Sequence, residues 1–280
     1  MADIRKASLY QLIIMYTIVS AFAIIAIYPI FWLIVTSFKT TQEYMSTSKL
    51  AFPIRWNYAN YPRAWAMGKF ATLIFNSVFY TSVTVISQIV LSFMAGFAFA
   101  KLPSKLTPVL HGSFIIGILL TIQSIMVPLF LMINSVGLYN TKLGVLIPYV
   151  GLALPMGVYL STEYIKSIPD SVVESARIDG AKYLHIFRTI ILPIAAPVAV
   201  TVAILGTTGT WNEFMLINIL VSDGRLKSLP VGIASFSGAL ASNYGLQFAA
   251  LVIGMIPMIL FYIAFRKRIT QGVSAGAVKG

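Results

Sequence analysis

Six stretches of at least 20 residues in this chain contain no Asp, Glu, Lys or Arg. A helix needs about 20 mostly apolar residues to cross the hydrocarbon core of a bilayer. The chain is 58% hydrophobic and 10% charged, whereas a soluble domain carries about 25% charged residues. This composition excludes a soluble globular enzyme, a disordered chain and a fibrous protein. The uncharged stretches are 7–38, 70–100, 106–141, 143–162, 189–212 and 228–265.

Each stretch predicts one transmembrane helix, so we expect an all-α integral membrane protein with six spans in a single domain, residues 1–280. The last stretch is too short for two spans and a turn. The first is too long for a signal peptide, because its apolar sequence continues to Val35 and a signal core has about 7–15 residues. The expected spans lie near 11–37, 72–100, 109–134, 143–164, 194–220 and 246–265.

Basic residues predict the orientation of these spans. Six spans place both termini on one side, and the segments on that side hold twelve Lys and Arg against eight in the others. Cytoplasmic loops carry the excess of basic residues, so we expect both termini in the cytoplasm. The net charge of +12 would suggest nucleic acid in a soluble protein. Here the basic residues lie between apolar runs, so the partner is the lipid bilayer and not nucleic acid.

Catalytic groups are scarce in the sequence. There is no cysteine, and the two histidines, His111 and His185, are too few for most metal or triad chemistry. A P-loop needs G-x-x-x-x-G-K-[ST], but the Gly68-Lys69 pair is followed by Phe70 and lacks the first glycine. We therefore expect a protein that is not an enzyme, binds no cofactor and obtains any ATP energy from a partner.

The segment 166–193, called the charged segment below, holds three of the eight acidic residues. Ser167 lies at capping-box spacing from Asp170, which predicts a short helix over about 169–179. Gly180 predicts its end, because glycine accepts the positive φ of a helix C-terminus. A second short helix over about 182–190 is expected to follow. These local features alone fit a plain connecting loop equally well.

Two motifs bear a resemblance to a known family. Glu174-Ser175-Ala176, three residues, Gly180, nine residues and Ile190-Ile191-Leu192-Pro193 together resemble the EAA signature of permeases in binding-protein-dependent ABC importers, with Ser175 in place of an alanine. The motifs Trp211-Asn212-Glu213-Phe214 and Ser228-Leu229-Pro230-Val231-Gly232, with the tail 272–280, resemble carbohydrate permeases of the MalG type. The resemblance runs over nearly the whole chain.

The resemblance implies a MetI/MalG-like fold in a bacterial inner membrane, and a coupling role for the charged segment. In the family this loop forms a coupling helix that docks on a cytoplasmic ATPase. The partners implied are a second permease subunit, two ATPase subunits that bind ATP and Mg, and an extracytoplasmic sugar-binding protein. Import would proceed by alternating access, with an oligosaccharide as the favoured substrate. The residues carried over to the ATPase contact are Glu174, Ser175, Ala176, Asp179 and Gly180.

Polar residues inside the spans indicate a substrate path. Amides suit sugar hydroxyls, although hydrogen bonding between helices is the more frequent role of a lone Asn or Gln. Two alternatives stay open: an ABC importer for another solute, and an ion-driven transporter. The second would need ionisable residues in several spans, and only Glu213 lies well inside one. The candidate path residues are Asn76, Tyr80, Gln88, Gln123, Trp211, Asn212 and Glu213.

Overall fold

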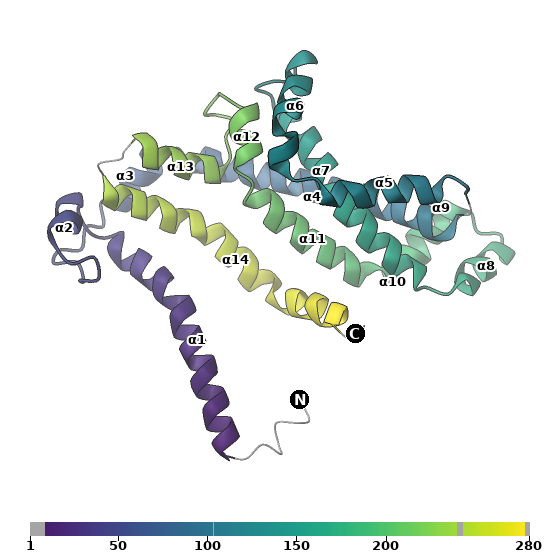
Figure 1. Cartoon of the computed structure of the whole chain (residues 1–280), viewed down its shortest axis with the longest axis horizontal. Coiled ribbons are helices and arrows are strands. Elements are labelled where there is room, and N and C mark those ends of the chain that lie inside the picture. The colour runs from purple at the N-terminus through teal and green to yellow at the C-terminus, as the bar shows by residue number, and fades with distance from the viewer. Residues whose placement is uncertain (1–8, 103, 240–242, 278–280) are drawn as a thin grey trace. The chain divides into compact units, whose positions relative to one another are not determined.

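The structure is a computed structural model that describes residues 9–102, 104–239 and 243–277. These residues form helices joined by turns, with no strand among them (Figure 1). The helices are α1 (Leu9–Thr36), α2 (Thr41–Ser46), α3 (Asn60–Met67), α4 (Phe70–Lys101), α5 (Thr107–Leu119), α6 (Ile122–Ser135), α7 (Lys142–Lys166), α8 (Asp170–Ile178), α9 (Tyr183–Ile186), the π-helical turn η2 (Phe187–Ile191), α10 (Leu192–Ile194), α11 (Ala196–Trp211), α12 (Met215–Leu220), α13 (Leu229–Ala239) and α14 (Tyr244–Ala277).

The chain divides into two compact units. The first takes its residues from 1–69 and 233–257, and the second from 70–232 and 258–280. In the first unit Asn60 donates hydrogen bonds to the carbonyls of Ser37 and Lys39, at 2.8 and 2.9 Å, and so holds α3 against the end of α1. The second unit contains every residue that the sequence singled out as functional.

Four helices are long and apolar enough to cross a membrane: α1, α4, α7 and α14. They confirm four of the expected spans, although α14 continues past residue 265 to Ala277. Two further helix pairs pass the same test but are sharply bent, by 108° between α5 and α6 and by 76° between the segment Tyr183–Ile194 and α11. The described residues therefore hold four spans, or six if each bent pair counts as one.

The expected span 109–134 is not one continuous helix. Leu120 and Thr121 adopt extended backbone, with ψ of 121° and 144°, and separate α5 from α6. Neither glycine nor proline stands at this break. Instead Thr121 precedes α6 with its hydroxyl 2.8 Å from that of Ser124, a local side-chain interaction that competes with the helical backbone.

The expected span 194–220 is bent at its start and interrupted further along. Ala195 leaves the helix between α10 and α11, where Pro193 and Pro197 each lack an amide hydrogen. The helix then stops at Trp211, and α12 starts at Met215. At this second break the carboxylate of Glu213 accepts hydrogen bonds from the first amides of α12. The same residue that was expected inside a span therefore caps the helix that follows.

Small residues allow α4, α7 and α11 to pack closely in the second unit. Gly96 of α4 faces Ser161 of α7 so closely that a Cβ atom at position 96 would overlap its hydroxyl. Ser161 donates a hydrogen bond to the carbonyl of Ser92, at 2.7 Å. Small residues are enriched where membrane helices contact one another, because dispersion forces and hydrogen bonds drive the association. This packing fixes α4 and α7 relative to one another. α4 ends at Lys101 and α7 ends at Lys166, shortly before α8.

Candidate functional site

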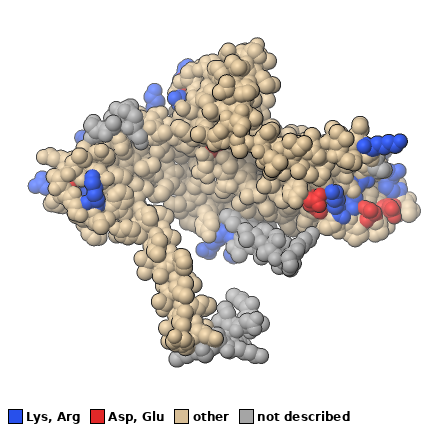
Figure 2. All heavy atoms as spheres, viewed as in Figure 1, with Lys and Arg blue, Asp and Glu red and all other residues tan. Residues whose placement is uncertain are grey.

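Charged side chains gather at one end of the second unit. Figure 2 shows blue and red atoms together around the end formed by α8 and α9, beside a long surface with almost no charge. α8 carries Asp170 in its first turn and Arg177 in its last, each at the end where it interacts favourably with the helix dipole. Gly180 follows with φ of +84°, which confirms the expected glycine stop.

The expected capping box at Ser167 is wrong. The residue before α8 is Pro169, which makes no side-chain cap. The hydroxyl of Ser167 donates backwards to the carbonyl of Tyr164, at 2.7 Å, and so belongs to the end of α7. Pro169 fixes its own φ and prevents its predecessor from continuing the helix, which explains why α7 and α8 are separate. The second expected helix is shorter than 182–190, because α9 passes into the π-helical turn at Phe187.

Lys101, the last residue of α4, anchors α8. Its ammonium group donates to the carbonyl of Ile168, at 2.5 Å, and to the carboxylate of Asp170, at 2.6 Å. The Lys101 side chain is 3% exposed and that of Asp170 is 76% exposed. On its inner side α8 buries Val173 and Ala176 in a core with Ile186 and other residues of the following helices. The short helix is thus attached to the spans by one ion pair and one apolar face.

The residues carried over from the EAA resemblance fall on two sides of this helix. Glu174, Ser175, Asp179 and Gly180 are exposed. Ala176 is 8% exposed and packs within the core of the chain itself. The small size of residue 176 therefore serves the attachment of α8 to the spans, and four of the five residues are available to a partner.

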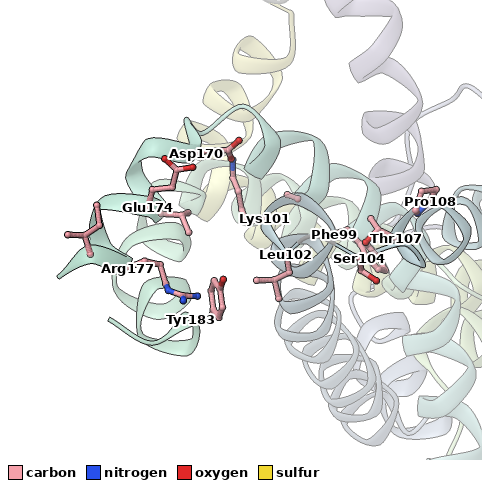
Figure 3. Close-up of a pocket in the computed structure, with 13 residues that line it drawn as sticks. Phe99, Lys101, Leu102, Ser104, Thr107, Pro108, Asp170, Glu174, Arg177 and Tyr183 are labelled. Carbon is pink, nitrogen blue, oxygen red and sulfur yellow. The ribbon is translucent and has the colours of Figure 1, made fainter. Parts of the chain in front are cut away.

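A hollow of about 800 Å³ lies between α8 and the turn that joins α4 to α5. Figure 3 shows Arg177 and Tyr183 pointing toward one another in it, with Asp170 and Glu174 above them. The Arg177 guanidinium lies 4.3 Å from the centre of the Tyr183 ring, a distance typical of a cation–π interaction. The hollow offers both signs of charge beside the exposed face of α8.

A second cavity, of about 320 Å³, lies among α4, α6, α7 and α11. It brings together two of the seven candidate path residues, Gln88 and Glu213. The other residues that line it are Ile122, Tyr149, Leu152, Ala153, Met156, Leu205, Gly206, Gly209 and Thr210.

Glu213 is held by three hydrogen bonds. Tyr149 donates its hydroxyl to one carboxylate oxygen, at 2.5 Å. The backbone amides of Leu216 and Ile217 donate to the two oxygens, at 2.6 and 3.2 Å. These contacts join α7 to the break between α11 and α12, so Glu213 has a clear structural role at the rim of the cavity.

The other candidate path residues do not line this cavity. Asn76 donates to the carbonyls of Arg225 and Lys227, and Tyr80 to that of Leu226, all within 2.9 Å. These two residues therefore hold the loop between α12 and α13. The remaining three residues also lie outside the cavity lining. Gln123 is exposed, with its amide 3.5 Å from the Met215 sulfur, and Asn212 is exposed and donates to the Thr208 carbonyl. Trp211 is buried.

The structure adds three residues that the sequence did not single out. Tyr149 and Thr210 line the cavity, and Lys101 anchors α8. Lys101 carried a signal, because it is the first charged residue after a long apolar stretch. Nothing in the pattern around Tyr149 distinguished it from the many apolar-facing aromatic residues of the chain.

Apolar spans, broken helices and a charged helix pair at one end define a multi-pass helical membrane protein. Residues 88–275, more than half of the chain, match the family of binding-protein-dependent transport system inner membrane components. The chain belongs to this family of ABC transporter permeases.

Several relatives share nearly the full length of the chain. The melibiose/raffinose/stachyose import permease protein MelC of Bacillus subtilis is 31% identical over 90% of this chain and 91% of its own. The trehalose/maltose transport system permease protein MalG of Thermococcus litoralis is 31% identical over 92% of this chain and 93% of its own. A bacterial ABC transporter that imports the acidic polysaccharide alginate has a chain with the same fold, with a TM-score of 0.79, 24% identity and coverage of 91% and 95%.

Proposed function

We propose that this chain is the permease subunit of an ATP-driven importer that moves a sugar, in particular an oligosaccharide, across a bacterial cytoplasmic membrane. The observation that carries the proposal is the exposed EAA-type helix α8, attached to the spans through Lys101 and through its buried face. The substrate class rests on the names of MelC and MalG, which list sugars of two or more rings.

The charged segment would couple the chain to a separate ATPase. Its exposed acidic residues Glu174 and Asp179 can form charge-assisted hydrogen bonds with basic residues of a partner. Ser175 and Gly180 would allow the partner surface to come close. Two ATPase subunits would bind ATP and Mg, and this chain would bind no cofactor of its own. Closure of the ATPase pair would move α8, and α8 would move α4 through Lys101.

The complete transporter would contain a second, related permease and an extracytoplasmic sugar-binding protein. The distribution of basic residues supports a cytoplasmic location for both termini and for the charged segment. Movement of the two permeases against one another would open the path alternately to each side. The bent helix pairs give this chain places where such a movement could occur.

The direct test uses the transporter purified with all its subunits and reconstituted in liposomes with its binding protein. We expect uptake of radiolabelled trehalose, maltose or raffinose that requires ATP on the side of α8. We also expect the ATPase to co-purify with the wild-type chain and with Ser48→Trp, but not with Ser175→Trp. Both serines are exposed, but Ser175 lies on α8 whereas Ser48 is remote in sequence from the charged segment.

Two results would contradict the proposal. ATP-independent uptake driven by an ion gradient would show a different class of transporter. Co-purification of the ATPase with Ser175→Trp at the wild-type ratio would show that α8 is not the contact.

A further inference from the structure

The cavity among α4, α6, α7 and α11 has the size of a small-molecule site. Its volume of about 320 Å³ lies at the lower end of the roughly 300–1,000 Å³ found for ligand pockets. Like such pockets, it is mostly apolar with a few polar groups. The polar groups come from three different helices and the α11–α12 break: Gln88, Tyr149, Thr210 and Glu213.

Gln88 brings a buried hydrogen-bond acceptor to the wall of this cavity. Its side chain is 3% exposed, and its amide nitrogen donates to the carbonyl of Ala153, at 2.7 Å. Its amide oxygen has no hydrogen-bond partner among the described residues. A buried acceptor without a partner is destabilising, because it has lost its hydrogen bonds to water. Gly206 faces this oxygen so closely that a Cβ atom there would overlap it, so glycine at this position is what gives the amide oxygen room.

The charge of the cavity selects a neutral ligand. No Lys or Arg is among its described lining residues, so nothing compensates an anionic ligand. The one carboxylate, that of Glu213, is already paired with Tyr149 and two backbone amides, and so offers little to a cation. What remains is an amide acceptor and a threonine hydroxyl, which suit a neutral molecule that donates from hydroxyl groups.

We propose that this cavity is a carbohydrate subsite within this subunit, where one ring of the sugar lies while it crosses the membrane. A sugar hydroxyl would donate to the Gln88 amide oxygen. The inference rests on the proposed function as a sugar permease and goes further, because it assigns part of the binding path to this chain and not only to its permease partner.

Gly209 provides a probe that fills the cavity without disturbing the packing. It lines the cavity, and a Cβ atom at this position would meet no atom within 4 Å. In the reconstituted complete transporter, we expect Gly209→Leu to reduce raffinose and maltose uptake about tenfold, while ATP hydrolysis stays within about twofold of wild type. Gly151→Leu is the matched control, because Gly151 also faces open space but does not line the cavity.

Gln88→Leu tests the acceptor itself. We expect at least a fivefold lower ratio of sugar transported to ATP hydrolysed, measured with saturating substrate-loaded binding protein. Gln42→Leu is the control, since Gln42 is exposed, lies outside the cavity and is not among the candidate path residues. A merely structural role for Gln88 would lower uptake and ATP hydrolysis together and leave their ratio unchanged, and this result would overturn the role of Gln88.

The experiments distinguish failure of the proposed subsite from failure of the proposed function. If the wild-type transporter moves none of the sugars tested, both the proposed function and the subsite are wrong. If the wild type transports sugar and Gly209→Leu transports it at the same rate, the proposed function stands and the subsite is wrong. The Gly209 result decides this point even if Gln88→Leu does not assemble.

Discussion

Lys101 is the residue on which the position of α8 depends most. It is buried, yet its ammonium group reaches the Ile168 carbonyl and an exposed carboxylate, that of Asp170. Water screens the exposed carboxylate of Asp170, so the ion pair itself contributes little to the stability of α8. The larger effect comes from the buried ammonium group and the carbonyl, which would each lose a partner if the other were removed.

Replacement of Lys101 by Met should therefore loosen α8 without unfolding the spans. Loss of these hydrogen bonds should cost about 1–2 kcal/mol locally, which corresponds to roughly tenfold faster hydrogen exchange of the α8 amides if they open locally. Lys105→Met is the control, because Lys105 is exposed and forms no ion pair among the described residues. Unchanged exchange in Lys101→Met, measured by mass spectrometry, would show that α8 is held by its apolar face alone.

Gly180 and Glu213 show how single positions set the limits of helices. Gly180 has a positive φ at the end of α8, and its amide donates to the Arg177 carbonyl at 3.0 Å. Glu213 acts at the start of a helix, because its carboxylate accepts hydrogen bonds from amides in the first turn of α12 and from the Tyr149 hydroxyl. Both devices create the short helices that distinguish this fold from a simple bundle of straight spans.

The effect of a substitution at Gly180 on uptake should depend on whether the new residue can adopt a positive φ. Proline cannot adopt a positive φ and has no amide hydrogen, so Gly180→Pro should abolish uptake while membrane insertion continues. Gly180→Asn should retain most uptake, because asparagine tolerates the left-handed region, and no atom obstructs a side chain at this position. Uptake assays with quantification of the inserted protein would test this order. Normal transport by Gly180→Pro would contradict a coupling role for the α8–α9 turn.

The Tyr149–Glu213 hydrogen bond should couple α7 to α12. Tyr149→Phe and Glu213→Gln should each lower the thermal stability of the detergent-solubilised protein, by an amount equivalent to about 1 kcal/mol. In the double variant the losses should not add, because both remove the same contact. Additive shifts in unfolding temperature would indicate that the two residues act independently.

At the scale of the molecule, residues 70–232 of the second unit carry most of their charge toward two ends. The charged segment lies at one end with Lys101, and Lys142, Asp223 and Arg225 lie toward the other, near the start of α4. This arrangement matches a protein that crosses a bilayer, since charges at the bilayer centre are costly. It also places the two ends of α4 and α7 on opposite sides of the membrane.

The absence of cysteine from the sequence allows this topology to be tested with single substitutions. A membrane-impermeant maleimide should label Ser222→Cys in intact cells, and should label Lys182→Cys only in inverted vesicles. Both positions are exposed. Labelling of Lys182→Cys from outside would invert the orientation and remove the proposed contact with a cytoplasmic ATPase.

The sequence by itself determined the class of the protein and most of its spans. Long uncharged stretches can only satisfy their backbone in a membrane as helices or closed barrels, and their lengths match single helices. α1, α4, α7 and α14 therefore needed no tertiary information. The same holds for the end of α8 at Gly180, because only a few residues accept its backbone conformation and glycine does so at least cost.

Tertiary structure alone decided where the long helices break and which polar residues meet. The break at Thr121 has no glycine or proline to mark it, and only the hydrogen bonds of Glu213 to α12 and Tyr149 distinguish it from a buried residue within a span. Gln88 and Glu213 share a cavity, whereas Asn76 and Tyr80 hold a loop. These differences arise because helices 60 or more residues apart supply the partners, and no local pattern records which side chains they bring together.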